Sequence, residues 1–301
     1  MFEVYYMDNE DKTLKKGSAE DLPSIKKDKE KRLWVDVSKI TKKEAEILHT
    51  TFDLHSLTTE DLFKQNTRIK VETFNNYLFC VFYGIEKDMS LNELDFVIGD
   101  TFIITNHGNR HGSHSLAFDE LKQDTVRLEQ LFVKGPAFIF HELLDREVDS
   151  YYPILESIDD EIEEIEEAVT RRPDPEVLSR ILRIKRTIIS VKKVGFQQRE
   201  KISFLAKNEY QFIPKKILPY FRDVYDHAIR VSDALDNYRE AISNTFDVYM
   251  SAVNNNMNEV MKVLSVIATI ALPLTVISGI FGTNFTHLPG SSAEYGFWMM
   301  I

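Results

Sequence analysis

The chain has one cysteine, Cys80, among its 301 residues. An intrachain disulfide is therefore impossible, which is typical of a protein that folds in a reducing compartment. Basic residues are also in the minority. The chain has 37 Lys and Arg against 48 Asp and Glu, which gives a net charge of -11. The chain thus lacks the basic surface that binds nucleic-acid phosphates, so we expect no nucleic-acid partner. An excess of carboxylates suits the attraction of cations.

The common catalytic patterns are missing as well. The sequence has no phosphate-binding glycine loop, no nucleophile elbow and no carboxylate pair at catalytic spacing, so we do not expect an enzyme. The first residues, Met-Phe-Glu-Val, are typical of a strand and lack the basic and apolar regions of a signal peptide. We therefore expect most of the chain to be cytoplasmic.

Charge is absent from residues 263–281, which read VLSVIATIALPLTVISGIF. This length approaches the ~20 apolar residues that cross a bilayer as a helix. Gly282 and a polar loop over 282–294 follow, and a second apolar segment begins at residues 295–301. We expect a membrane hairpin with Lys262 on the cytoplasmic side. A second span of only these few residues would be too short for ~30 Å of hydrocarbon, so this form is expected to be inactive in transport.

Residues 1–130 alternate strand and helix patterns and predict an α/β domain. Thr41 and Glu44 have the spacing of a capping box, and Asn75-Asn76 and Gly99-Asp100 are typical of hairpin turns. Trp34 and Cys80 are expected in its core. The predicted strands are 2–6, 33–37, 68–74, 77–85, 94–98 and 101–106, and the predicted helices are 41–52 and 56–63.

Residues 131–213 have helical spacing on both sides of the sequence RRPDP at 171–175, which predicts an antiparallel helical pair. A stalk helix over 214–262 is predicted to continue into the span, giving a rod of roughly 90 Å. Apolar residues recur along it every three or four positions from Val224 to Leu264. The simplest partner for so long a stripe is self-association around an axis that enters the membrane.

A polar face shares this rod, formed by Asp247, Ser251, Asn254 and Asn258 at steps of four, three and four. In an oligomer these residues would form rings of carboxylate and amide oxygens, which attract hydrated cations, while rings of leucine can close a pore by dewetting. The alternative is an ordinary solvated face. Within the span the face continues through Leu264 or Ser265, Ala268, Leu272, Thr275 and Gly279.

Two further charged patterns have simple structural interpretations. The acidic run at 158–167 is expected to pair with the basic return helix, which carries Arg180, Arg183, Lys185, Arg186, Lys192 and Lys193. The alternative role of the acidic run is to concentrate cations near a pore. Three histidines, His107, His111 and His114, lie in a short glycine-containing segment that could bind Zn²⁺, although an exposed loop is favoured.

Several strings resemble the CorA-type divalent-cation transporters. They are NEVMKVL at 258–264, ALPLT at 271–275, GIFGTNF at 279–285 and PYFRDVYDH at 219–227. Residues 57–68 with Val71, Glu72 and Tyr77 resemble the cytoplasmic domain of that family. The resemblance covers most of the chain. It implies an α+β membrane protein with an N-terminal α/β domain, a long stalk and two spans per protomer. It also implies a homopentamer in the cell membrane that transports Mg²⁺, and also Co²⁺ and Ni²⁺.

The resemblance assigns ion capture to the loop Gly282, Thr283 and Asn284. The family pattern is Gly-Met-Asn after tyrosine, whereas this chain has Thr283 and Phe281. Related zinc transporters also vary the middle residue, so a Zn²⁺ transporter is the nearest alternative, and a membrane-tethered ligand-binding domain is another. The resemblance further implies that Asp223 binds a regulatory Mg²⁺ together with an acid of the neighbouring protomer, for which Asp88 is the candidate.

Overall fold

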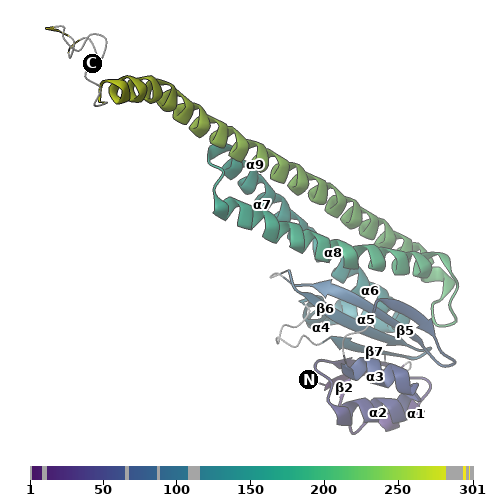
Figure 1. Ribbon diagram of the computed structural model, residues 1–301. Helices are drawn as coiled ribbons and strands as arrows, with labels where there is room; N and C mark the ends of the chain where they lie inside the picture. The colour runs from purple at the N-terminus through teal and green to yellow at the C-terminus, as the bar shows by residue number, and fades with distance from the viewer. Residues whose placement is uncertain are drawn as a thin grey trace.

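The computed structural model describes residues 2–8, 12–64, 68–86, 89–107, 116–282, 294–295 and 298. An α/β domain lies at one end, and a hairpin of two long helices rises from it beside a third helix, α9 (Figure 1). This third helix extends well beyond the hairpin. The described chain therefore has a wide base and a narrow helical end, as the sequence predicts.

A seven-stranded sheet forms the centre of the α/β domain. Its order is β2-β1-β3-β7-β6-β5-β4, with β3 and β7 parallel and every other pair antiparallel. The two predicted hairpin turns are confirmed, because Phe74 N donates to Tyr77 O and Gly99 N donates to Phe102 O, both at 2.8 Å. The sequence missed β2. The strands are β1 Phe2–Met7, β2 Leu14–Gly17, β3 Arg32–Val37, β4 Lys70–Thr73, β5 Leu78–Ile85, β6 Leu91–Ile98 and β7 Phe102–His107.

Helices cover both faces of this sheet, because its strands are apolar on both sides. One face packs against α1 Leu22–Lys27, α2 Lys42–Phe52 and α3 Ser56–Lys64, and the other against α4 Leu116–Gln123, α5 Thr125–Lys134 and α6 Pro136–Asp149. The capping box of α2 is confirmed, with Glu44 N donating to Thr41 Oγ1 at 3.3 Å and Thr41 N to Glu44 Oε2 at 2.7 Å. Trp34 and Cys80 are fully buried, as predicted.

A buried charged network crosses the second face. The carboxylate of Asp36 contacts His107 Nε2 at 3.0 Å and Lys122 Nζ at 3.0 Å, and it accepts a hydrogen bond from Thr105 Oγ1 at 2.5 Å. Thr105 in turn accepts one from Trp34 Nε1 at 2.9 Å. Burial alone would raise the pKa of Asp36, but the attraction of His107 and Lys122 holds that pKa at about 2. His107 is thus a structural residue, while His111 and His114 lie outside the described residues.

Three long helices form a bundle above the domain. They are α7 Tyr151–Arg171, α8 Pro175–Lys207 and, after the short helix η1 Lys215–Ile217, α9 Leu218–Phe281. The stripe on α9 packs against α7 and α8 of the same chain, since Val231, Leu235 and Ile242 are buried in a cluster with residues of both helices. The predicted self-association is therefore wrong for this part of the stripe. An intrachain bundle buries it as far as Tyr249, with Val253 partly buried.

The expected pairing between the acidic and basic helices is confirmed only in part. Arg180 contacts Glu161 at 3.0 Å and Glu164 at 2.7 Å, and Arg183 reaches Glu161 at 3.6 Å. Lys192 instead forms an ion pair with Asp236 of α9. The remaining three basic residues have no ion pair with any described residue. The prediction failed for them because α8 contacts two helices. Lys185 lies over the Phe246 ring of α9, 5.7 Å from its centroid, and Arg186 and Lys193 lie on the outward face of α8.

Two side chains join this bundle to the sheet. Strand β4 ends its pairing at Val81, so the backbone of Tyr83 has no neighbouring strand on that side. Gln198 of α8 replaces the strand, accepting from Tyr83 N at 2.6 Å, and Tyr151 of α7 donates its hydroxyl to Tyr83 O at 3.1 Å. Gln198 Nε2 also donates to Tyr151 Oη at 2.9 Å. The side chains of Gln198 and Tyr151 are both buried, which makes this joint a fixed point between domain and stalk.

Candidate ion pathway and metal cluster

The exposed side of α9 carries a polar seam, which we define as two rows of residues that each repeat every seven positions. A seven-residue repeat stays on one side of helices that supercoil around each other. All members are exposed in the single chain. One row is Asp226, Asp233, Glu240, Asp247 and Asn254, and the other is Asp223, Arg230, Asn237, Asn244, Ser251 and Asn258.

The structure brings the four predicted polar residues onto this seam and extends it towards the base. The sequence prediction began only at Asp247, although the same alternation of three and four residues runs back to Asp223. Four of the five residues in the first row are acidic. In an assembly with this seam facing an axis, those carboxylates would line the cytoplasmic approach to the span.

Beyond Val253 the helix is not covered by any residue that the structure describes. The apolar part of α9 is the single helix in the described residues that is long and apolar enough to cross a membrane, with a mean hydropathy of 2.3 and none of that segment buried. Leu264 is 56% exposed and Leu272 is 68% exposed, so both are free to contact lipid or other helices. This segment requires an environment that the single chain does not supply.

Polar groups inside the span are satisfied within the helix. The hydroxyls of Ser265, Thr269 and Thr275 donate to the carbonyls four residues earlier, at 2.8, 2.7 and 2.8 Å. Each hydroxyl oxygen keeps lone pairs that can accept a hydrogen bond. The oxygen of Thr275 can therefore contact the water shell of an ion without leaving an unpaired donor in the membrane. Pro273 lies inside the helix and has no N–H to donate.

Gly282 ends the helix, and its N–H donates to Ser278 O at 2.8 Å. A Cβ atom at this position would lie 3.0 Å from the same carbonyl oxygen, so a larger residue would be crowded. Gly279, by contrast, has open space around its Cα. Thr283 and Asn284 lie outside the described residues.

A second polar site lies at the base of α9, where it contacts α6. Asp145 and Asp149 are one turn apart on α6, and His227 of α9 points towards them with Nδ1 3.9 Å from Asp145 Oδ1 and 2.9 Å from Asp149 Oδ1. One ligand atom from each residue lies within 4.8 Å of the other two. We call these three residues the basal cluster. Carboxylates with an imidazole are a donor set that suits divalent cations.

Asp223 lies one turn before His227 and belongs to the same electrostatic site. Burial, followed by the negative charge of Asp149, raises the pKa of Asp145 to about 6, and Asp223 adds to this increase. Asp223 itself is exposed and forms no ion pair with a described residue. Its predicted partner, Asp88, lies outside the described residues. Sequence reasoning found Asp223 but missed Asp145 and Asp149, whose spacing of four on one helix was the available signal.

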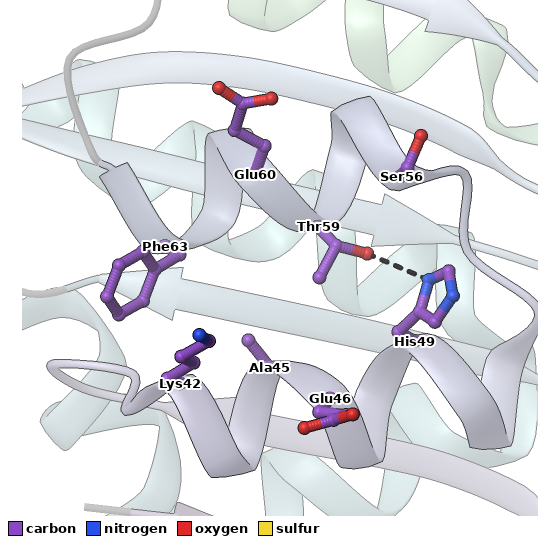
Figure 2. Close-up of a pocket in the computed structure, with 8 residues that line it drawn as sticks. All are labelled: Lys42, Ala45, Glu46, His49, Ser56, Thr59, Glu60 and Phe63. Atoms are coloured by element: carbon purple, nitrogen blue, oxygen red, sulfur yellow. Dashed lines mark hydrogen bonds between the residues drawn. The ribbon is translucent and has the colours of Figure 1, made fainter.

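The α/β domain also has an open cleft of about 350 Å³ between α2 and α3 (Figure 2). Lys42 and His49 of α2 face Thr59 and Phe63 of α3 across it, and His49 Nδ1 lies 3.2 Å from Thr59 Oγ1. The walls combine one aromatic ring with scattered charges. The hydroxyl of Thr59 also donates to His55 O at 3.3 Å.

Comparison with known proteins places these features in a family. The family described as CorA-like Mg2+ transporter protein matches residues 29–301. The chain belongs to this family. It is 33% identical to the cobalt/magnesium transport protein CorA of Thermotoga maritima over 307 residues, which cover all of this chain and 87% of that protein. It is therefore a membrane transport protein of the CorA type with a soluble N-terminal domain, as the sequence predicted.

Solved structures agree with the fold. The chain resembles the CorA magnesium transporter of Methanocaldococcus jannaschii with a TM-score of 0.84 at 22% identity, covering 100% of this chain and 92% of that one. The cytoplasmic domain of ZntB from Vibrio parahaemolyticus also resembles it, with a TM-score of 0.64 at 14% identity over 86% of this chain and 99% of that domain. The α/β domain with a long helical stalk is thus shared by both.

Proposed function

We propose that this chain is one protomer of a homopentameric, channel-like transporter of hydrated Mg²⁺, which also admits Co²⁺ and Ni²⁺. The observation that carries the proposal is the continuity of α9. One unbroken helix of 64 residues joins the polar seam to an apolar segment without cover. The relative from Thermotoga maritima is described as a cobalt/magnesium transport protein, which agrees with these substrates.

The chemistry of the seam suits an ion that keeps its water. Mg²⁺ loses water reluctantly, so a pathway should offer hydrogen-bond acceptors to the hydration shell and no tight cage of charged ligands. Asp247, Asn254 and Asn258 supply such oxygens from one exposed side of α9. Five copies around an axis would place them in stacked rings. Leu264 and Leu272 would supply apolar rings that interrupt the water column when the pore is closed.

We propose that Asn284 receives the ion at the outer mouth, with Gly282 allowing the tight turn before it. The test is uptake of Mg²⁺, Co²⁺ and Zn²⁺ by proteoliposomes that contain the full-length protein. Mg²⁺ uptake should be lost in Asn284→Ala and kept in Thr286→Ala, a substitution in the same loop. Wild-type uptake by Asn284→Ala would remove this residue from the mechanism.

Zinc transport is the second candidate, because Thr283 stands where the family pattern has methionine. The same experiment separates the two candidates. Uptake of Zn²⁺ without Mg²⁺ would select the zinc transporter, and Thr283→Met would then be expected to shift the preference towards Mg²⁺.

For regulation, we propose that Mg²⁺ binds between Asp223 of one protomer and Asp88 of its neighbour, next to the basal cluster. Carboxylates that face each other across an interface repel, and a divalent cation between them converts repulsion into attraction. A high internal Mg²⁺ concentration would then favour the closed, symmetric arrangement. This follows because a ligand shifts a conformational equilibrium through its preference for one state.

A further inference from the structure

The outward face of α8 has an apolar row that stays exposed among the described residues, although Arg199 lies over the Phe196 ring, 5.0 Å from its centroid. Leu182, Ile189 and Phe196 repeat every seven residues and are 38%, 50% and 51% exposed. Arg186 and Lys193 lie between them, are exposed, and form no ion pair with a described residue. Exposed apolar residues that gather in one row mark an interaction surface more often than residues scattered singly do. We call these five residues the α8 row.

The contacts of α8 show which way this row points. Arg180 marks the side that faces α7, through Glu161 and Glu164, and Lys192 marks the side that faces α9, through Asp236. At 100° per residue, Ile189 and Phe196 lie on the side of Lys192 and roughly opposite Arg180. The α8 row therefore lies on the flank of the bundle that is remote from α7.

The opposite flank is acidic. On α7, Glu161 and Glu164 face α8, whereas Glu166 faces α9 through its hydrogen bond from Thr245 Oγ1 at 3.0 Å. Asp159 and Glu163 lie on the side of Glu166, are exposed, and form no ion pair with a described residue. One flank of each bundle is thus basic and apolar, and the other is acidic.

In a closed ring around the α9 seam, the α8 flank of one copy faces the α7 flank of the next, because a cyclic contact joins two different surfaces. Residues at equal height along the axis meet, since rotation adds no translation. The Thr245–Glu166 contact sets the height of α7 along α9, and the Lys192–Asp236 contact sets the height of α8. At 1.5 Å per residue from these two contacts, Lys193 and Asp159 differ by about 5 Å in height along the axis. Arg186 falls near Glu163 and Glu166 by the same count.

From this complementarity we propose that the α8 row docks on Asp159 and Glu163 of α7 in the adjacent copy. The contact rests on the oligomer proposed above. It pairs Lys193 with Asp159 and Arg186 with Glu163, and it covers Ile189 and Phe196 with the stems of these side chains. The helical pairs then form a continuous collar around the stalk. Movement of one protomer would be transmitted to the next at this collar as well as at the base.

Cysteine cross-linking in membranes that contain the full-length protein tests the contact. Cys80 is fully buried and burial raises the pKa of its thiol, so introduced cysteines would be the reactive ones. The double variant Lys193→Cys with Asp159→Cys should form a ladder of linked chains under mild oxidation, because each copy carries both halves of the contact. Within one chain these positions lie on opposite flanks. The control pairs Lys193→Cys with Asp160→Cys, which is rotated about 100° away from the contact.

A ladder in the first variant and none in the control supports the proposal, and its highest member counts the copies in the ring. No ladder in the first variant overturns it. The native mass of the same sample in mild detergent, together with Mg²⁺ uptake, then separates the two failures. An intact oligomer that transports Mg²⁺ without a ladder leaves the proposed function standing, whereas a monomer without uptake removes both.

Discussion

His227 on α9 lies 2.9 Å from Asp149 at the end of α6, measured from Nδ1 to Oδ1. This contact fixes the base of the membrane-directed helix against the α/β domain. Because Asp145 and Asp223 are part of the same electrostatic site, a change of charge there acts directly on the root of α9. Binding of a cation to the basal cluster would therefore change the contact that holds the base of α9 against the domain.

Replacing Asp223 by lysine should remove regulation by internal Mg²⁺. The ammonium group would take the place of the cation at the interface, so high Mg²⁺ would lose both its inhibition of uptake and its protection against proteolysis. Asp88→Lys should have the same effect. Glu30→Lys, an exposed change of the same charge on the α/β domain, serves as the control. Inhibition that persists in both Asp223→Lys and Asp88→Lys would show that the sensor lies elsewhere.

Leu272→Ser should raise the resting leak of ions through the closed protein. A polar ring in place of an apolar one lowers the cost of wetting the pore. Leu264→Ser is expected to act in the same direction. Ile270→Ser is the matched control, because residue 270 lies about 160° around the helix from residue 272. Equal leak in the Leu272 and Ile270 variants, measured by electrical recording in planar bilayers, would contradict the assigned face.

Asp36→Asn should flatten the acid dependence of stability. Because the folded-state pKa of Asp36 is about 2 and its ordinary value is 3.8, the charged network stabilises the fold above pH ~4, and this stabilisation is lost as the pH falls towards 2. The difference amounts to about 2 kcal/mol at neutral pH. Thermal unfolding in detergent from pH 7 to 2.5 measures it, with the exposed Asp160→Asn as control. If the Asp36→Asn variant lost stability between pH 4 and 2.5 as steeply as the unaltered protein, the charge of Asp36 would not be the source of this pH dependence.

Gln198→Leu should loosen the joint between sheet and bundle. The substitution removes the acceptor of the Tyr83 N–H and the donor to Tyr151 Oη, while the Tyr151 hydroxyl still donates to Tyr83 O. Loss of the buried acceptor should cost about 1–3 kcal/mol. Hydrogen exchange at β5 and the lower half of α8 should become faster, while α2 and α3 stay protected. Gln197→Leu, one residue away and exposed, should leave the exchange rates as they are. Slow exchange at β5 in the Gln198 variant would argue against the joint.

Much of this architecture was readable from local patterns. The hairpin turns at Asn75-Asn76 and Gly99-Asp100 and the capping box at Thr41 depend on neighbouring residues, so the sequence predicted them. Strand β2 and helix α1 were missed. Leu14–Gly17 is a four-residue edge strand with two lysines, and it has little pattern of its own because only its pairing with β1 holds it in place.

The wrong predictions of which helices pack together have one cause. A periodic apolar stripe shows that a helix is packed but not which element packs against it. Val231 and Leu235 predicted a packed helix correctly but not that α7 and α8 of the same chain would cover them. Lys192 was expected to face α7 and instead contacts Asp236. The spacing of Asp145 and Asp149 puts both on one side of a helix, but it does not indicate that the fold brings His227 to them from nearly eighty residues away along the chain.

The unbroken course of α9 makes it a lever. Its 64 residues span roughly 95 Å at 1.5 Å per residue, with the basal cluster near one end and Gly282 at the other. If the base is the pivot, a tilt of about 3° displaces the far end by roughly 5 Å, about the diameter of a side chain. A rearrangement of carboxylates too small to alter the fold of the domain is therefore sufficient to move the apolar end of α9 by the width of a side chain.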